Sequence, residues 1–424
     1  MAQSVPSMLS KGSVMPESAL RLPPIQFPYL GNSGAVGLFS LLHISLAGLS
    51  IGFIVLAPLL EYLGIRDPFY TRLARSLVRF VAVTFSISGV FAVMMVELFI
   101  GLFPVSTVYI FQRVEFGTYV AIAVFFLHIW FFYAYWYRWE KMRAKSIKRH
   151  IALGVIAALL IVTWGALLDG IGSYMLTPPE RDLAGLGRFD LARLTFLFNP
   201  TWVPLMLHRF LGEMILSFYA IGFYGGLRLL LPRLDAEQKA YYTRVMQFGI
   251  IIGTGLLIIQ PLAGMLYAVQ IRRANPQAYQ RIIYGPEEWL VRIQFLLVGL
   301  LFVLSNWFLA PLSSNPRRAR MLNGIVLIAA FLMILTTQQI WLRRAFTLVL
   351  ILITLYHLSH ILLRGDLPSL RRPGPWLAIS VGFCAMATFL VMGVIREQAR
   401  RPYTVYGQIQ IHDESLPVSE FVRR

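Results

Sequence analysis

The chain has 424 residues, of which 57% are hydrophobic and only 14% are charged. Its mean hydropathy of +0.66 lies well outside the range of soluble domains, so we expect an integral membrane protein. A single cysteine, Cys384, excludes a disulfide framework, a cysteine-ligated zinc site, an iron–sulfur cluster and a CxxCH attachment site. Any metal cofactor must therefore use histidine, methionine or carboxylate ligands.

The formal net charge of +18 does not indicate nucleic acid binding, because arginine and lysine occur in short segments between apolar runs. Such a distribution is typical of membrane topology and lipid contact. Roughly the first thirty residues are polar and contain proline, and they lack the basic-then-apolar pattern of a signal peptide. We expect the first membrane helix to direct insertion.

Ten apolar runs are long enough to cross a membrane as helices. They cover residues 35–63, 78–103, 116–138, 150–170, 203–231, 243–269, 289–312, 321–341, 345–363 and 375–395. Only Trp341-Leu342-Arg343-Arg344 separates the eighth run from the ninth, so nine helices is the alternative. The sequence therefore predicts an all-α, polytopic transmembrane bundle of about ten helices.

Basic residues orient this bundle. The loops after the first, third and fifth helices contain Arg66, Arg72, Arg75, Lys141, Arg143, Lys145, Lys148, Arg149, Arg233 and Lys239. The loop after the second helix offers only Arg113. By the positive-inside rule, odd-numbered helices run inward and the N-terminus lies on the outer side. We expect the polar segments 176–201 and 270–288 to be loops on that outer face.

Histidines are the most informative side chains in the predicted spans. His43 falls about eight residues into the first helix and His208 about five residues into the fifth, and both lie in the outer half of the bilayer. Asn199-Pro200 marks the entry to the fifth helix, and Pro204 fits its first turn. Histidines at one depth on different helices suit a haem, although hydrogen bonding to a neighbouring helix is an equally good explanation for one histidine alone.

The other histidines and acids in the spans have simpler explanations. His128 is intramembrane, and the pair His357 and His360 has HxxH spacing, for which hydrogen bonding between helices is favoured over metal binding. We expect His150 and His412 at solvent or an interface. An intramembrane carboxylate such as Glu97 should be buried and paired, protonated or part of a proton path.

At this point the residues resemble subunit I of the cytochrome bd quinol oxidases. Asn199-Pro200 followed by His208 is similar to the family's NP-x7-H segment, whose histidine is an axial ligand of the low-spin b haem. His43 matches the first-helix histidine that ligates a high-spin haem at the oxygen-reducing site. The stretch Glu397-Gln-Ala-Arg400-Arg401-Pro402-Tyr403 is similar to the motif E-x-G-R-Q-P-W, whose glutamate ligates haem.

The resemblance implies three haem-iron ligands and one supporting cation. His43, His208 and Glu397 would bind iron, and Arg400 would neutralise haem propionates. The implied organisation is a polar N-terminal segment (1–34), a haem-binding bundle (35–312), two additional transmembrane helices (313–374), a last helix with the ligand motif (375–403) and a C-terminal tail (404–424).

The chain also departs from the family. The family's R-I-M, whose methionine is the second ligand of the low-spin haem, reads Arg292-Ile293-Gln294 here. Ala123 and Phe131 stand where two acids normally deliver protons to the oxygen site. The long quinol-binding loop is reduced to 270–288, and two extra helices precede the last one. We interpret the chain as a divergent member.

We therefore expect a haem-binding membrane subunit of a bd-like quinol oxidase or oxidoreductase, which moves electrons from membrane quinol through haem to oxygen or to a partner redox subunit. The resemblance implies haem b, with two or more haems and haem d as one option among them. Expected partners are membrane lipid, quinone, and a second membrane subunit or a cytochrome c-type subunit, or both, without nucleic acid. The expected location is a bacterial or archaeal cytoplasmic membrane.

Three alternatives stay open. A non-oxidase membrane cytochrome b would exchange electrons between quinone and a multihaem cytochrome, which the residues at positions 123, 131 and 294 favour. A proton-coupled transporter would use Glu97, His128 and Asp169, but it should show broken helices in corresponding halves of the sequence, and we find none. A structural anchor that has lost its haems is the third.

Overall fold

A computed structural model describes residues 26–179, 190–191, 194, 198–363 and 374–415. Ten helical stretches in these ranges are long and apolar enough to cross a membrane, which confirms the predicted class and number. The elements are α1 (Gly31–Leu63), α2 (Pro68–Leu102), α3 (Pro104–Tyr137), α4 (Trp139–Lys145), α5 (Ile147–Tyr174), α6 (Trp202–Leu230), α7 (Ala236–Leu257), α8 (Gln260–Ala274), α9 (Pro276–Tyr284), α10 (Glu288–Leu309), η3 (Ala310–Leu312), α11 (Pro316–Leu335), α12 (Ile340–Leu362), α13 (Gly374–Arg400), β1 (Tyr403–Val405), β2 (Ile409–Gln410) and η4 (Ile411–Ser415).

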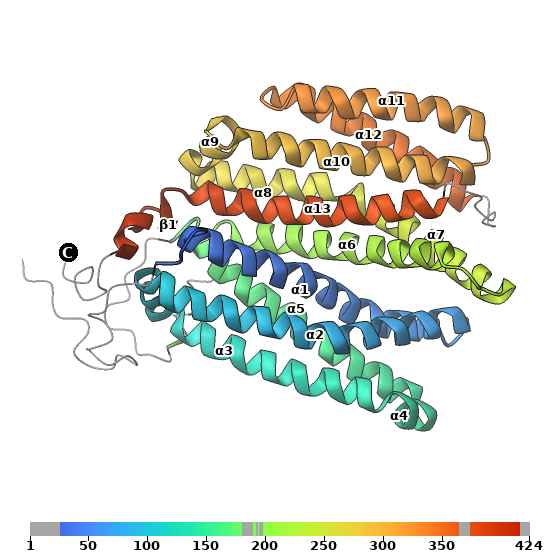
Figure 1. The fold of residues 1–424 in the computed structure, drawn as a ribbon, viewed down its shortest axis with the longest axis horizontal. Helices are drawn as coiled ribbons and strands as arrows, with labels where there is room; N and C mark the ends of the chain where they lie inside the picture. The colour runs from blue at the N-terminus through green and yellow to red at the C-terminus, as the bar shows by residue number, and fades with distance from the viewer. Residues whose placement is uncertain (1–25, 180–189, 192–193, 195–197, 364–373, 416–424) are drawn as a thin grey trace, which may run out of the picture.

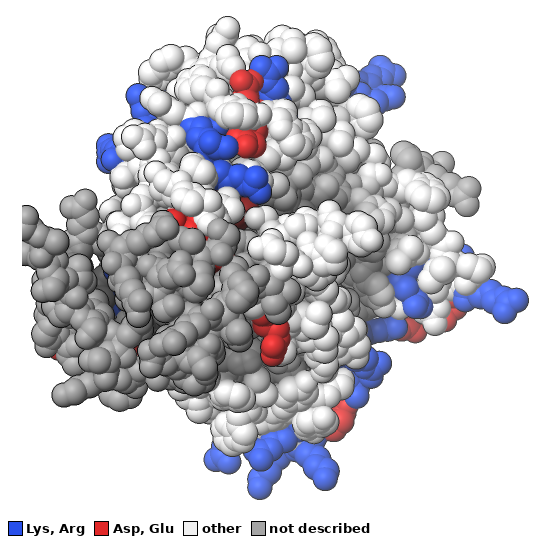
Figure 2. All heavy atoms as spheres, turned by 60° about the vertical axis from the view of Figure 1, so that its left-hand side comes forward, with Lys and Arg blue, Asp and Glu red and all other residues white. Residues whose placement is uncertain are grey.

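The long helices lie roughly side by side, with α4 at one end of the bundle and β1 at the other (Figure 1). We call these the α4 end and the β1 end. Helices α11 and α12 pack against α10 at one edge, on the far side of the bundle from α2 and α3. Most of the surface in Figure 2 is uncharged, and Lys and Arg gather in patches, as expected for a protein surrounded by lipid.

Several helices begin at a capping side chain followed by proline. The side chain of Asp67 accepts from Phe69 N at 3.0 Å, and Asn275 accepts from Ala278 N at 3.0 Å. Each cap satisfies a backbone N–H that the first turn leaves free, and proline next in sequence has no N–H to satisfy. Asn315 caps α11 in the same way. Asp-Pro and Asn-Pro pairs therefore fix where these helices start.

The predicted sixth run, 243–269, is one span made of two helices. Helix α7 ends at Leu257, and α8 begins at Gln260 with Pro261 in its first turn. A proline there has no N–H to give to the preceding turn, so the helix breaks before it. The break leaves Gln260 at the start of a new helix, where its side chain faces α6.

Glycines let α6 lie close to α1 and α7. A side-chain carbon at Gly48 of α1 would lie 3.7 Å from Glu213 Cγ, and one at Gly52 would lie 2.8 Å from Ser217 Cβ. The second contact lies four residues further along both helices than the first, so α1 and α6 run in the same direction. On the other face of α6, a carbon at Gly249 of α7 would lie 2.5 Å from the carbonyl oxygen of Phe218. Such small residues permit close helix packing in membranes.

We expect Gly249→Ala to destabilise the protein, because the new methyl group would press on backbone atoms of α6. The expected loss is about 1–3 kcal/mol, as for overpacking of a core. Gly255→Ala in the same helix is the control, since no atom lies within 4 Å of its side-chain position. The midpoint of thermal unfolding in detergent, followed by circular dichroism, should fall only for Gly249→Ala. Equal midpoints would contradict the close contact.

Candidate functional site

His43 and His208 lie at the same level in the bundle. His43 is five residues before Gly48 in α1, and His208 is five residues before Glu213 in α6. Gly48 and Glu213 are in contact, and the two helices run in the same direction. Equal steps back along both helices therefore reach the same depth. The two imidazoles share the level that their sequence positions led us to expect.

The His43 ring is held by the backbone of α2. Its Nδ1 lies 3.0 Å from the carbonyl oxygen of Ser88 and 3.2 Å from the hydroxyl of that residue. Because a carbonyl oxygen only accepts, Nδ1 carries the proton and Nε2 keeps its lone pair. Histidines that bind metals have this arrangement, in which the other ring nitrogen donates to a carbonyl. Nε2 makes no hydrogen bond within the described part of the chain.

His208 faces the break between α7 and α8. The amide nitrogen of Gln260 lies 3.2 Å from His208 Nδ1 and 3.1 Å from the His208 carbonyl oxygen. An amide NH₂ only donates, so in this arrangement Nδ1 accepts and Nε2 carries the proton. The Tyr267 ring stacks on the imidazole, with centroids 6.0 Å apart. Metal binding through Nε2 therefore requires Gln260 to move or to turn its amide over.

The start of α6 is tied to the end of α5. The Asn199 side chain donates to Ser173 Oγ at 2.8 Å and accepts from Thr201 N at 3.3 Å. Asn199 is 6% exposed, so these bonds satisfy a buried amide. The Asn-Pro pair thereby fixes the first turn of α6 and the level at which His208 enters the bundle.

Glu397 and Arg400 lie in the last turns of α13 at the β1 end. They form an ion pair, and 47% of the Glu397 side chain is exposed. Arg400 also contacts Met175 Sδ at 3.0 Å, and its Nε is buried with no partner among the described residues. The ion pair must open before Glu397 can bind a metal.

Helix α13 approaches α1 near His43. A side-chain carbon at Gly393, one turn before Glu397, would lie 3.7 Å from Leu41, two residues before His43. Within the described ranges, no three His, Cys, Asp or Glu side chains gather as a metal cluster. The structure thus brings His43 and His208 to one level and pairs Glu397 with Arg400, but it does not bring the three predicted ligands into one cluster.

Sequence patterns alone do not reveal the strongest charge cluster near these residues. Arg209, next to His208, bonds to Asp169 Oδ1 at 2.6 Å and to Glu213 Oε1 at 2.9 Å. Both acidic side chains are 4% exposed. One guanidinium fork serves both carboxylates, which leaves one net negative charge when both are ionised. One feature of the sequence could have indicated this cluster: Glu213 lies inside an apolar run, where a charged side chain needs a partner.

Other predicted positions differ in their surroundings. His128 is buried, and its Nδ1 lies 2.9 Å from the carbonyl oxygen of Ala157. Glu97 is exposed on α2, so the expectation of a carboxylate buried within this chain is wrong. His360 Nδ1 lies 2.8 Å from Ser314 Oγ, as expected for a hydrogen bond, but both ring nitrogens of the buried His357 are without a hydrogen-bond partner within the described part of the chain. Gln294 is 8% exposed, and its Oε1 has no partner within the described part of the chain.

The segment after α13 folds back over the β1 end of α3. Strands β1 and β2 pair, and Val405 and Ile409 are 0% exposed. Glu414 accepts from the backbone N–H groups of Val105 and Ser106, each at 3.0 Å, in the first turn of α3. A carboxylate there satisfies free N–H groups of the helix. The described part of the predicted C-terminal tail, residues 404–415, is therefore packed against the bundle.

Comparison with known proteins identifies the family. The model described as cytochrome bd terminal oxidase subunit I matches residues 35–281. The chain belongs to this family. The fold is similar to that in "The structure of bd oxidase from Geobacillus thermodenitrificans", with 14% sequence identity and a TM-score of 0.53, over 87% of this chain and 98% of that chain. Comparison with curated proteins gave no match.

Membership makes this chain a membrane quinol oxidase-type subunit of respiratory electron transport, and its apolar helices make it an integral multi-pass protein. The matched range runs from α1 to α9 and contains His43 and His208. It ends before Gln294 and Glu397, so the role predicted for Glu397 depends on its sequence motif alone.

We expect Arg209→Leu to lower the free energy of unfolding by about 3–5 kcal/mol, because two buried carboxylates lose their cation. Arg75→Gln is the control, since Arg75 and its partner Glu140 are 48% and 70% exposed. An exposed pair contributes about 0–1 kcal/mol. Thermal unfolding in detergent should separate the two variants, and similar losses would argue against a buried ion cluster.

We expect the C-terminal segment to loosen as pH rises. Burial raises the pKa of Glu414 above its ordinary value of 4.5, although hydrogen bonds from Ser106 and Val105 act in the other direction. The packed segment then holds a proton that the detached segment has lost, so packing weakens as pH rises from 4.5 through the raised pKa. Hydrogen exchange of the Val105 and Ser106 amides, corrected for intrinsic rates, measures how firmly the C-terminal segment is packed at each pH. Glu414→Gln should remove the trend, and protection that grows with pH in the unaltered protein would contradict it.

Proposed function

We propose that this chain is the haem-carrying subunit of a bd-type quinol oxidoreductase, with His43, His208 and Glu397 as iron ligands. The observation that carries the proposal is the His43 hydrogen bond to the Ser88 carbonyl oxygen, which leaves Nε2 with a free lone pair. His43 also lies in the range that matches the family and shares its level with His208.

Arginines at the β1 end supply the charge that haem propionates require. Arg400 and Arg401 each have a buried Nε without a partner among the described residues. A buried N–H group without an acceptor is unfavourable by about 1–3 kcal/mol, and a carboxylate from a bound group would relieve this. These two residues fit the role of propionate partners, and Arg400 is the one named by the motif.

In mechanism, the protein provides positions and charges, and a bound haem supplies one-electron chemistry at its iron. Nδ1–H of His43 donates to Ser88 and fixes the ring, while two buried acids hold charge beside Arg209, the residue next to His208. The first haem that we propose is haem b, and the electron donor is membrane quinol. Quinol would be oxidised at the β1 end and release its protons there.

The shortened loop 270–288 is the proposed quinol-facing surface. It folds into α9, and Arg281 donates from Nε to the Gln398 carbonyl oxygen at 3.2 Å. Gln398 follows Glu397, so this contact joins the loop to the end of the helix that contains the proposed ligand. Quinol bound against α9 would lie next to the proposed site.

One observation favours an acceptor other than oxygen. Gln294, where the family has a methionine ligand, is buried, and its amide oxygen has no partner within the described residues. Ala123 is exposed and Phe131 is half-buried where the family places acids for proton delivery. The second candidate is therefore a cytochrome b that passes electrons to a partner, such as a cytochrome c-type subunit, without reducing oxygen.

Reduced-minus-oxidised visible spectra with pyridine-haemochrome analysis, repeated with CO, test these proposals on the purified full chain. We expect haem bands, loss of the CO-responsive band in His43→Ala, and loss of the low-spin band in His208→Ala. His412→Ala is the control, because that side chain is 69% exposed and lies outside the spans. Haem bands without a CO response would favour the second candidate. Complete absence of haem would refute both.

A further inference from the structure

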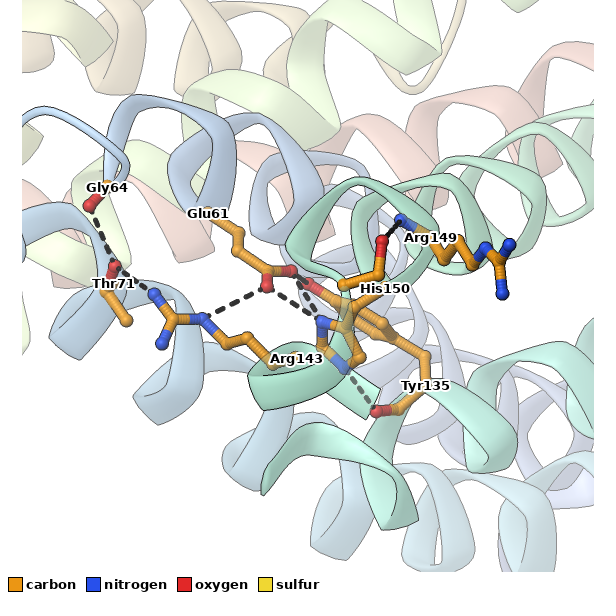
Figure 3. Close-up of polar contacts among 8 residues, drawn as sticks. Glu61, Gly64, Thr71, Tyr135, Arg143, Arg149 and His150 are labelled. Atoms are coloured by element: carbon orange, nitrogen blue, oxygen red, sulfur yellow. Dashed lines mark hydrogen bonds and ion pairs between the residues drawn. The ribbon is translucent and has the colours of Figure 1, made fainter. Parts of the chain in front are cut away.

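A second buried ionisable group lies at the α4 end, away from the proposed haem ligands (Figure 3). Glu61 of α1 and His150 of α5 are both 0% exposed, and the Glu61 oxygens lie 2.7 and 2.9 Å from His150 Nδ1. Tyr135 of α3 donates its hydroxyl to Glu61 Oε2 at 2.8 Å. The expectation that His150 lies at solvent is therefore wrong. Three helices meet at one carboxylate.

Both nitrogens of His150 face oxygen acceptors. Nε2 lies 3.1 Å from the Tyr135 carbonyl oxygen, which only accepts, so Nε2 carries a proton. A neutral imidazole has no second proton, yet Nδ1 faces the Glu61 carboxyl group. The contact at Nδ1 therefore needs a further proton, on Nδ1 or on Glu61. The pair holds one proton more than a carboxylate beside a neutral histidine.

Arg143 of α4 separates this pair from the aqueous surface. Its Nε lies 3.3 Å from Glu61 Oε1, and its Nη2 donates to Thr71 Oγ1 at 3.2 Å. The Arg143 side chain is 30% exposed and lines a pocket of about 530 Å³, together with Gly64 and Thr71. That volume holds several water molecules, each of about 30 Å³. One guanidinium thus separates a fully buried carboxylate from a pocket large enough to hold water.

The groups around Glu61 and His150 can stabilise the pair both with and without its shared proton. Tyr135 faces Glu61 from α3, Arg143 faces it from α4, and Arg75 of α2 lines the pocket. The edge of the Trp139 ring system lies against His150, with centroids 5.0 Å apart, and covers it with apolar surface. If the shared proton leaves, Arg143 still compensates an ionised Glu61. Neither state leaves the carboxylate without a partner.

We propose that Glu61 and His150 form a proton-exchange site, which takes one proton from water in the pocket past Arg143 and returns it. Only a proton moves, between water and the pair. The basic loops predict that this end faces the cytoplasm. The site would serve a reaction that consumes protons within the bilayer, and His128, two turns before Tyr135 on α3, is the next histidine inward. The exchange involves no haem, so its test does not depend on the proposed function.

Infrared difference spectra of the purified full-length protein, recorded between pH steps with and without ¹³C-labelled histidine, test the site. We expect a carboxyl band and an imidazole band to change together. Glu61→Gln should abolish both changes, whereas Glu237→Gln should keep them, because Glu237 is 87% exposed and does not line the pocket. If Glu61→Gln does not fold, Glu61→Asp serves instead and should keep a coupled but displaced carboxyl band.

Two outcomes would overturn the proposal. The first is a pair of bands that stays constant over every pH at which the protein remains folded, as a purely structural contact would. The second is a pair of bands of which neither the carboxyl nor the imidazole band shifts in the folded protein after transfer to D₂O, because the shared proton would then not exchange with water in the pocket.

Discussion

The constraint on which the rest of this structure depends is that a charge inside an apolar bundle must have a partner. An unpaired ion within the membrane is strongly unfavourable, and removal of one partner leaves the other exposed to that penalty. Arg209 joins Asp169 of α5 to Glu213 of α6, and Glu61 of α1 meets residues of α3, α4 and α5. Specific polar contacts therefore hold α1, α3, α4, α5 and α6 in place, in addition to packing.

Some buried polar groups have no hydrogen-bond partner within the described part of the chain. Gln260, Gln294, Arg400 and Arg401 each have a buried polar atom without a partner in the described part of the chain. Such atoms are unfavourable in a folded protein unless something outside the chain satisfies them. Arg400 and Arg401 lie at the end of α13, at the β1 end, and Gln260 contacts His208. Unpaired atoms thus occur beside the residues that the family motifs select, and also away from them, at Asn306, Asn323 and His357.

Most of the fold could be predicted from the sequence, because length and apolarity determine a membrane span almost by themselves. The shared depth of His43 and His208 also follows from counting along helices. The break before Pro261 was not predicted, because the largely apolar run 243–269 was interpreted as one helix. The burial of His150 was not predicted either, because a histidine beside basic loop residues resembles a surface residue until Glu61 and Tyr135 are placed next to it. The bond between Gln260 and His208 likewise joins residues far apart in sequence, and only tertiary packing decides which tautomer results.

The place of each helix in the bundle explains how a chain that departs from the family's motifs can keep the centre of the family fold. Helices α1, α6 and α13 contact one another directly, whereas α11 and α12 pack on the outer side of α10. These are the two spans that the resemblance predicts as additions, and their place at that edge leaves the contacts between α1 and α6 intact, and with them the level shared by His43 and His208. Gln294 lies on α10, which packs against α11 and α12 as well as against α13. A glutamine where the resemblance predicts a methionine ligand would therefore change one position on α10 without requiring any change in the hydrogen bond that orients His43.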